Sequence, residues 1–330
     1  MTNSTHTSSY NDLNDFRESP ILLRYAERTG FRHFQRISRF AYNAVLWHSM
    51  KMERNKKTPN QSLRDGPKRD RLLNYIEALQ ARGRLVFTSA EAQKTLFDSP
   101  NAFIKASLRL IRRDKLFRPV KGFYVIIPTE YRSGKSVPPE WYIDALMKFH
   151  EQPYYVGGLS AAALFGAAHQ APQELQVITT KPLRPVTAHR TRIRFLTKKA
   201  IERTPLQEMK THTGYFKVST PEATAFDLIR YYRWAGYLSN VATVLAELSE
   251  RLDPKKLVDA ARAEGEIAHA QRLGHLLERY GDKKKASELR KWISEKETKL
   301  VPLRPGWNGD VSSRDEHWRV LVNDVVETDL

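Results

Sequence analysis

The stretch that decides the fold of the N-terminal half is SPNAFIKASLRLIRRDKLFRPVKGFYVII, residues 99–127. Ser99 is a good helix cap, and Pro100 suits the first helical position, where its missing N–H would have no partner. We therefore predict a helix from Pro100 to about Arg113. Apolar residues at helical spacing indicate its buried stripe: Ile104, Leu108 and Ile111. A cationic row with the same spacing is turned by about 100° around the axis: Lys105, Arg109 and Arg112.

The segments around this helix predict a larger pattern over residues 68–127. Downstream, residues 116–127 read as a two-stranded ribbon with Lys121-Gly122 at the turn. Upstream, a strand at 85–87 is followed by a helix that runs to Leu96. Thr88 and Glu91 form a capping box at the start of this helix. A first helix ends at Gly83 and carries Leu72, Leu73, Ile76 and Leu79. A winged helix-turn-helix has this order of elements: helix, strand, helix, basic helix and ribbon.

A recognition helix needs one face that packs on its own domain and another that offers cations to the DNA major groove. The basic helix meets this requirement, although a basic helix by itself is more often an ordinary solvated face. We expect four of its side chains to enter the groove: Asn101, Lys105, Arg109 and Arg112. Four further cations are expected to hold phosphates: Arg113, Lys115, Arg118 and Lys121.

The distribution of charge supports a polyanionic partner. The 330 residues carry a formal net charge of +18. Residues 51–135 hold 20 Lys and Arg against 8 Asp and Glu, so this quarter of the chain contributes two thirds of the excess.

The absence of cysteine excludes disulfides, thiolate zinc sites and cysteine nucleophiles. No apolar stretch approaches the roughly 18 residues of a membrane span, and the polar N-terminus does not resemble a secretory signal. We therefore expect a cytoplasmic protein that does not enter a membrane.

The rest of the chain predicts an α+β domain at residues 141–330, after a linker at 128–140. Apolar strands are expected at 154–156, 174–179, 192–196 and 215–219. Thr220 as cap and Pro221 at the first helical position predict the start of a further helix. Helices with amphipathic spacing follow around residues 241–248, 267–277 and 286–293, so the domain ends in a helical subdomain. Residues 318–322 are expected to return as a strand. Residues 1–67 are an extension whose polar start is expected to be disordered. The predicted fold class is α+β, an N-terminal winged helix-turn-helix followed by this larger domain.

No pattern in this second domain predicts catalysis. Gly134-Lys135-Ser136 lacks the earlier glycine of a P-loop, and Ser160 has only part of a nucleophile elbow, so a helix cap is the better interpretation. Asp227 and Glu222 are interpreted as a cap and a surface charge. The histidines lack metal-ligand spacing. We expect no enzyme activity, no cofactor and no metal.

Several ordered blocks of this sequence resemble the AbiEi family, the antitoxins of type IV toxin–antitoxin systems, which act in abortive infection against phage. The longest blocks are residues 154–180 (YYVGGLSAAALFGAAHQAPQELQVITT) and 214–231 (GYFKVSTPEATAFDLIRY). Shorter blocks are NVATVL from Asn240, AQRLG from Ala270 and WRVLVN from Trp318. The resemblance covers about residues 68–330.

The resemblance implies an autorepressor whose winged helix binds inverted repeats in its own promoter. It also implies that the C-terminal domain, residues 141–330, neutralises a nucleotidyltransferase-like toxin without a stable complex. The residues alone leave two other classes open. One is a plain transcriptional regulator whose second domain senses a ligand or dimerises. The other is an enzyme that uses the winged helix for targeting.

Overall fold

A computed structural model describes residues 70–97, 99–168, 172–307 and 310–328. The predicted extension 1–67 lies outside these residues. Among the described residues, no helix is long and apolar enough to cross a membrane.

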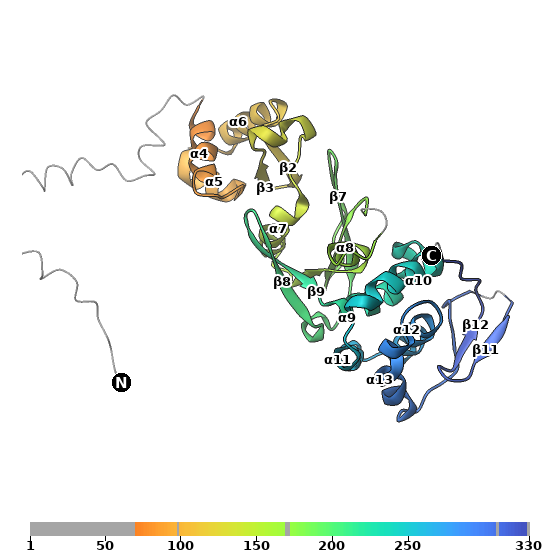
Figure 1. Ribbon diagram of the computed structural model, residues 1–330. Helices are drawn as coiled ribbons and strands as arrows, with labels where there is room; N and C mark the ends of the chain where they lie inside the picture. The colour runs from red at the N-terminus through yellow and green to blue at the C-terminus, as the bar shows by residue number, and fades with distance from the viewer. Residues whose placement is uncertain (1–69, 98, 169–171, 308–309, 329–330) are drawn as a thin grey trace, which may run out of the picture. The chain divides into compact units, whose positions relative to one another are not determined.

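The N-terminal elements have the predicted order. They are α4 (Arg71–Gln80), β1 (Val86–Thr88), α5 (Ser89–Leu96), α6 (Pro100–Arg112), β2 (Leu116–Val120) and β3 (Phe123–Ile126). The strands form an antiparallel sheet in the order β1-β3-β2 (Figure 1). Gly83, after α4, and Gly122, in the β2–β3 turn, have positive φ angles of 71° and 90°, which glycine adopts without strain.

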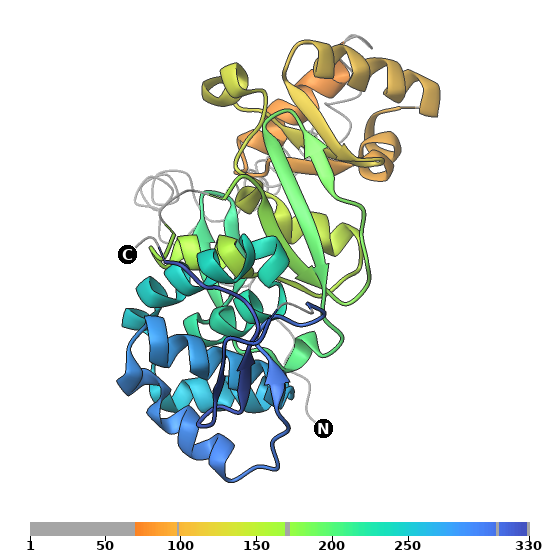
Figure 2. The ribbon, with the colours of Figure 1, turned by 90° about the vertical axis from the view of Figure 1, so that its right-hand side faces the viewer.

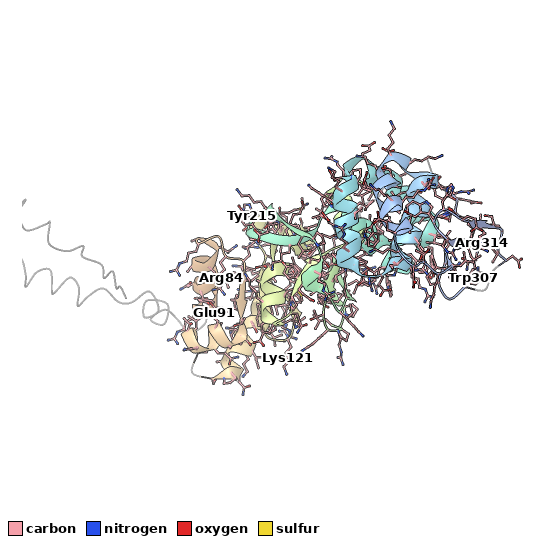
Figure 3. The ribbon with its side chains drawn as sticks, turned by 90° about the horizontal axis from the view of Figure 1, so that it is seen from below. Arg84, Glu91, Lys121, Tyr215, Trp307 and Arg314 are labelled. Atoms are coloured by element: carbon pink, nitrogen blue, oxygen red, sulfur yellow. The ribbon has the colours of Figure 1, made fainter. Side chains whose placement is uncertain are left out.

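The predicted helix caps are present. The Ala102 N–H donates to Ser99 Oγ at 3.3 Å, and the Glu91 N–H donates to Thr88 Oγ1 at 3.2 Å. The Glu91 carboxylate in turn accepts a backbone hydrogen bond from Thr88, so the capping box is complete. The same carboxylate accepts two hydrogen bonds from Arg84, at 2.6 and 2.7 Å, and one from Tyr75 (Figure 3). Hydrogen bonds between charged groups are stronger than neutral ones, so the Arg84 contact ties α5 to the segment that follows α4.

The predicted buried stripe of α6 is wrong. Ile104 and Leu108 are exposed, at 47% and 42% of their accessible surface, and Ile111 is half-buried. The buried residues are instead Phe103, Ala106, Ser107 and Leu110. The Phe103 ring packs edge-on against Phe97 and Tyr124, so the helix rotates to bury its largest apolar side chain.

A six-stranded mixed sheet forms the centre of the next part of the chain. Its order is β6-β7-β5-β4-β9-β8. The strands are β4 (Tyr154–Val156), β5 (Leu175–Thr179), β6 (Val186–Ala188), β7 (Thr191–Thr197), β8 (Leu206–Thr211) and β9 (Gly214–Ser219). The four predicted strands are confirmed as β4, β5, β7 and β9. The unpredicted β6 and β8 lie at the two edges, where a strand needs little apolar sequence.

The β2–β3 ribbon shares a hydrophobic core with one face of this sheet. Phe117 and Phe123 belong to the same buried cluster as α7 (Ile143–Phe149) and β4. The Phe117 ring lies 5.6 Å from Tyr142. The segment expected as a linker contributes buried Val137 to this core. It also contains the 3₁₀ helices η1 (Thr129–Gly134) and η2 (Pro139–Trp141), so it is ordered between the two parts that it joins.

The C-terminal part is mainly helical, as predicted. After α8 (Gly158–Leu164) and the sheet come α9 (Pro221–Arg230), the 3₁₀ helix η4 (Tyr232–Ala235), α10 (Tyr237–Leu248), α11 (Pro254–Glu264), α12 (Ile267–Tyr280) and α13 (Lys283–Ser294). Helices α10–α13 lie together in Figure 2 around one apolar core. Of these elements, η4 and α11 were not predicted. Thr220 caps α9 as expected, accepting from the Ala223 N–H.

The chain ends in a small sheet that packs on α12. Its strands are β10 (Val301–Pro302), β11 (Ser313–Asp315) and β12 (Val320–Val322), in the order β10-β12-β11. The fully buried Trp318 ring lies against Gly274, and Gln271 Nε2 donates to the Trp318 carbonyl at 2.9 Å. Two of the short blocks quoted above, AQRLG and WRVLVN, are therefore in direct contact.

We predict that Gly274→Ala destabilises the chain. An added Cβ would lie 2.0 Å from a carbon of the Trp318 ring. Overpacking of this kind costs about 1–3 kcal/mol. The roughly 1 kcal/mol that alanine gains in helix propensity offsets only part of this. Urea unfolding measures the change, and the cost should shrink in a Trp318→Phe background. Unchanged stability would contradict the described contact.

Candidate functional site

The predicted DNA-binding residues lie on α6 and the segment that follows it. Asn101, Lys105, Arg109 and Arg112 occupy the outer surface of α6, and all four are exposed. The remaining four are Arg113 at the C-cap of α6, Lys115 before β2, Arg118 on β2 and Lys121 at the β2–β3 turn. Of these, Lys115 is half-buried and the others are exposed.

These cations are available to an external partner. Among the described residues, none of the seven is paired with a carboxylate. The nearby acids have other partners, since Asp114 pairs with Lys135 at 3.3 Å and Glu91 with Arg84. The surface of α6 and its flanks therefore has positive charge that the described chain leaves uncompensated.

The turn that carries Lys121 is held in place by the fold. The Ser89 N–H donates to the Gly122 carbonyl at 2.8 Å. A Cβ on Gly122 would lie 3.3 Å from the Phe149 ring. The ribbon is therefore short and seated against α5 and α7, while the Lys121 side chain is exposed (Figure 3).

A second cluster of charged residues is buried in the C-terminal part. Lys198, Asp227 and Glu264 have side chains that are 5%, 0% and 2% exposed. Lys198 Nζ lies 2.8 Å from Glu264 Oε2 and 3.9 Å from Asp227 Oδ1. Arg230 and His269 also contact Glu264, at 2.6 and 2.9 Å. Four segments supply these residues: the one that follows β7, α9, α11 and α12.

The interpretation of Asp227 and Glu222 as a cap and a surface charge is wrong, because both are buried. Asp227 accepts a hydrogen bond from Tyr155 at 2.9 Å, and Glu222 accepts from the Asp253 N–H at the start of α11. Asp227 sits within the apolar run Ala225-Phe226-Asp227-Leu228-Ile229, the one signal that pointed to its burial. No comparable sequence signal marked Lys198.

The two buried carboxylates have opposite pKa shifts. Burial raises the pKa of Asp227 to about 6, and Lys198 only partly opposes this. Burial also acts to raise the pKa of Glu264. There, however, hydrogen bonds and charges from His269, Lys198 and Arg230 prevail and lower it to about 2. Glu264 is therefore the ionised centre of the cluster, whereas burial disfavours the charged form of Asp227.

The interpretation of Ser160 as a helix cap is also wrong. Gly157 occupies the N-cap of α8, and Ser160 lies inside the helix. Its Oγ accepts from the Gln176 N–H at 2.8 Å and donates to the Glu174 carbonyl at 3.2 Å. Ser160 thus joins α8 to the segment at β5.

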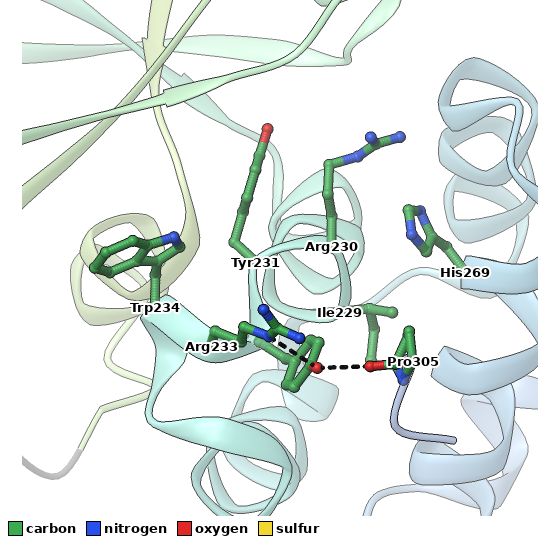
Figure 4. A pocket seen from close by; sticks show the side chains of 8 residues that line it. Ile229, Arg230, Tyr231, Arg233, Trp234, His269 and Pro305 are labelled. Carbon is green, nitrogen blue, oxygen red and sulfur yellow. Dashed lines mark hydrogen bonds between the residues drawn. The ribbon is translucent and has the colours of Figure 1, made fainter. Parts of the chain in front are cut away.

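An open hollow of about 370 Å³ lies beside the ionic cluster (Figure 4). Its lining is mainly aromatic and cationic: Ile229, Arg230, Tyr231, Tyr232, Arg233, Trp234, His269 and Pro305. Arg230 donates to Glu264, and Arg233 donates to the Tyr232 hydroxyl at 3.2 Å. Both guanidinium groups are therefore already engaged by acceptors of the chain.

We predict that Asp227→Asn changes the pH dependence of stability. The pKa of Asp227 is higher in the folded chain than in the unfolded chain. The stability that this carboxyl contributes is therefore fully present below its pKa in the unfolded chain, and it is lost as the pH rises through about 6. Between about pH 7.5 and about pH 5 the wild-type chain should gain roughly 1–1.5 kcal/mol relative to Asp227→Asn. Urea unfolding at both pH values measures this difference, with exposed Asp259→Asn as control. Parallel pH profiles for wild type and Asp227→Asn would contradict it.

Comparison with known proteins supports the sequence-based interpretation. Residues 155–279 match the model of the AbiEi antitoxin C-terminal domain, and this range contains the whole ionic cluster. No curated protein matches the chain. The fold is similar to the crystal structure of the RV2827C protein from Mycobacterium tuberculosis, with a TM-score of 0.54 and 15% identity over 81% of this chain and 93% of that one. At this identity the likeness concerns the fold alone. The family resemblance is therefore confirmed for residues 155–279, the segment that matches the AbiEi antitoxin C-terminal domain.

Proposed function

We propose that this protein is the antitoxin and autorepressor of a type IV toxin–antitoxin operon. The antitoxin role is supported by the family match of residues 155–279. In this proposal the C-terminal domain neutralises a nucleotidyltransferase-like toxin, and residues 71–127 form a winged helix-turn-helix that binds inverted repeats in the operon's promoter. A cytoplasmic location follows from both roles.

The DNA-binding part of the proposal rests on the exposed cationic surface of α6. A helix fits the major groove of B-DNA, where arginine, lysine and asparagine can reach base edges. Asn101, Lys105, Arg109 and Arg112 are exposed on the helix whose opposite side is buried in the N-terminal core. The ribbon adds Arg118 and Lys121 within the same segment, as backbone contacts of a winged helix require.

The runner-up is a plain transcriptional regulator whose second domain binds a ligand or dimerises. The hollow beside η4 is the observation in its favour, because it offers a concave surface. Its two arginines are already engaged, however, and the family match points to neutralisation of a toxin. We therefore favour the antitoxin.

The first test is a footprint of the full-length protein on the DNA upstream of its own coding sequence. We expect protection of inverted repeats. The second is co-expression with the toxin encoded beside it, where we expect relief of growth arrest. Failure to protect any upstream DNA would remove the repressor half, and failure to relieve arrest would remove the antitoxin half.

We predict different effects for Arg109→Ala and Lys121→Ala. A base-edge arginine contributes about 1–3 kcal/mol and sets sequence preference, whereas a phosphate contact acts on all sequences alike. Arg109→Ala should weaken binding to the footprinted duplex more than to a random duplex. Lys121→Ala should weaken both equally and reduce the salt slope by about one unit. Arg314→Ala, an exposed arginine on β11, is the matched control. Equal effects of the first two variants on both duplexes would contradict these roles.

We also predict that one substitution can remove repression of the promoter and leave neutralisation of the toxin intact. Arg109→Ala should lose repression of a promoter reporter and still relieve growth arrest by the toxin, because Arg109 lies outside the matched antitoxin domain. Immunoblotting controls for equal protein levels. Loss of both activities at equal levels would show that neutralisation needs the α6 surface.

A further inference from the structure

The outer surface of α6 is not purely cationic. Ile104 and Leu108 are 47% and 42% exposed, one helical turn apart. Leu108 lies about 160° around the axis from buried Leu110, at 100° per residue. It therefore points almost directly away from the N-terminal core. Isolated apolar side chains on a surface are common, but this pair lies among the cations proposed to bind DNA.

The neighbours of the pair restrict what can cover it. Lys105 directly follows Ile104, and Arg109 directly follows Leu108, while Arg112 lies one turn beyond Leu108 on the same face. An apolar protein surface laid over the pair would desolvate these cations without giving them partners, which is costly. A DNA duplex supplies phosphates for the cations. It also has an apolar group on its major-groove base edges, the 5-methyl of thymine.

We propose that Ile104 and Leu108 are specificity-determining residues that contact thymine methyl groups. This inference rests on the proposed DNA-binding function and deepens it, because it names the base that the apolar pair selects. Four residues of helix span about 6 Å, and base pairs rise by about 3.4 Å. The two side chains therefore reach thymines about one or two base steps apart. The neighbouring cations and Asn101 are left to bind polar base edges and phosphates.

The experiment replaces thymine by uracil in the duplex that the footprint identifies. Uracil lacks only the 5-methyl and keeps every hydrogen-bonding group of thymine. Binding of the full-length protein is measured to both duplexes at one salt concentration. Loss of one buried methyl corresponds to roughly a fourfold weaker Kd. We expect this loss per contacted thymine in the wild-type protein.

Variants then assign the effect to the pair. Ile104→Ala with Leu108→Ala should weaken binding to the thymine duplex and abolish the difference between the two duplexes. Both residues are exposed, so the double variant should fold, which circular dichroism checks. Leu164→Ala, an exposed leucine at the end of α8, should keep the full thymine preference.

Three results would overturn the inference, and they are distinguishable. Equal wild-type affinity for both duplexes would show that no methyl is read. A double variant that weakens binding to both duplexes by the same factor would place the pair against protein, for instance a second copy of this chain. Absence of binding to any upstream duplex would remove the proposed DNA-binding function itself.

Discussion

The burial of Phe103 is the constraint on which the proposed interface depends. Its ring packs against Phe97 and Tyr124, and Tyr124 in turn stacks on Phe87 of β1. This contact fixes the rotation of α6. Once Phe103 and Leu110 face inward, the side of the helix that carries Lys105, Arg109 and Leu108 must face outward. The composition of the outer surface is therefore a consequence of aromatic packing inside.

A different constraint organises the C-terminal part of the chain. A lysine and two carboxylates are nearly or fully buried together, and Arg230 and His269 complete the cluster. Buried charges are tolerated only when they are paired, so each member depends on the positions of the others. Because the members come from strands and helices far apart in sequence, the cluster holds the sheet and the helical part in one arrangement. The charged groups of the cluster pair with one another, except that Asp227 Oδ2 has no hydrogen-bond partner among the described residues.

The two halves are not independent modules joined by a loose linker. Phe117 and Phe123 of the ribbon pack in the same core as α7 and β4, and residues 128–140 add Val137 to it. The Lys121 turn is also supported by Ser89 and Phe149. A core that spans both halves keeps the proposed DNA-binding surface rigid, because displacing the ribbon would expose large aromatic side chains.

The sequence by itself determined the features that depend on interactions between residues close together in the chain. The caps at Thr88, Ser99 and Thr220, the glycine at the β2–β3 turn and the apolar strands β4, β5, β7 and β9 depend on residues within a few positions. The family resemblance rested on long ordered blocks.

Only the tertiary structure decided which face of α6 is buried, since Phe103 and Leu108 are both apolar and the choice depends on rings from β3 and the α5–α6 turn. It also decided that Asp227 is buried, because the lysine and tyrosine that make its burial tolerable lie 29 and 72 residues away in the sequence. Contacts between distant segments leave no local pattern, and these are the contacts that set the site.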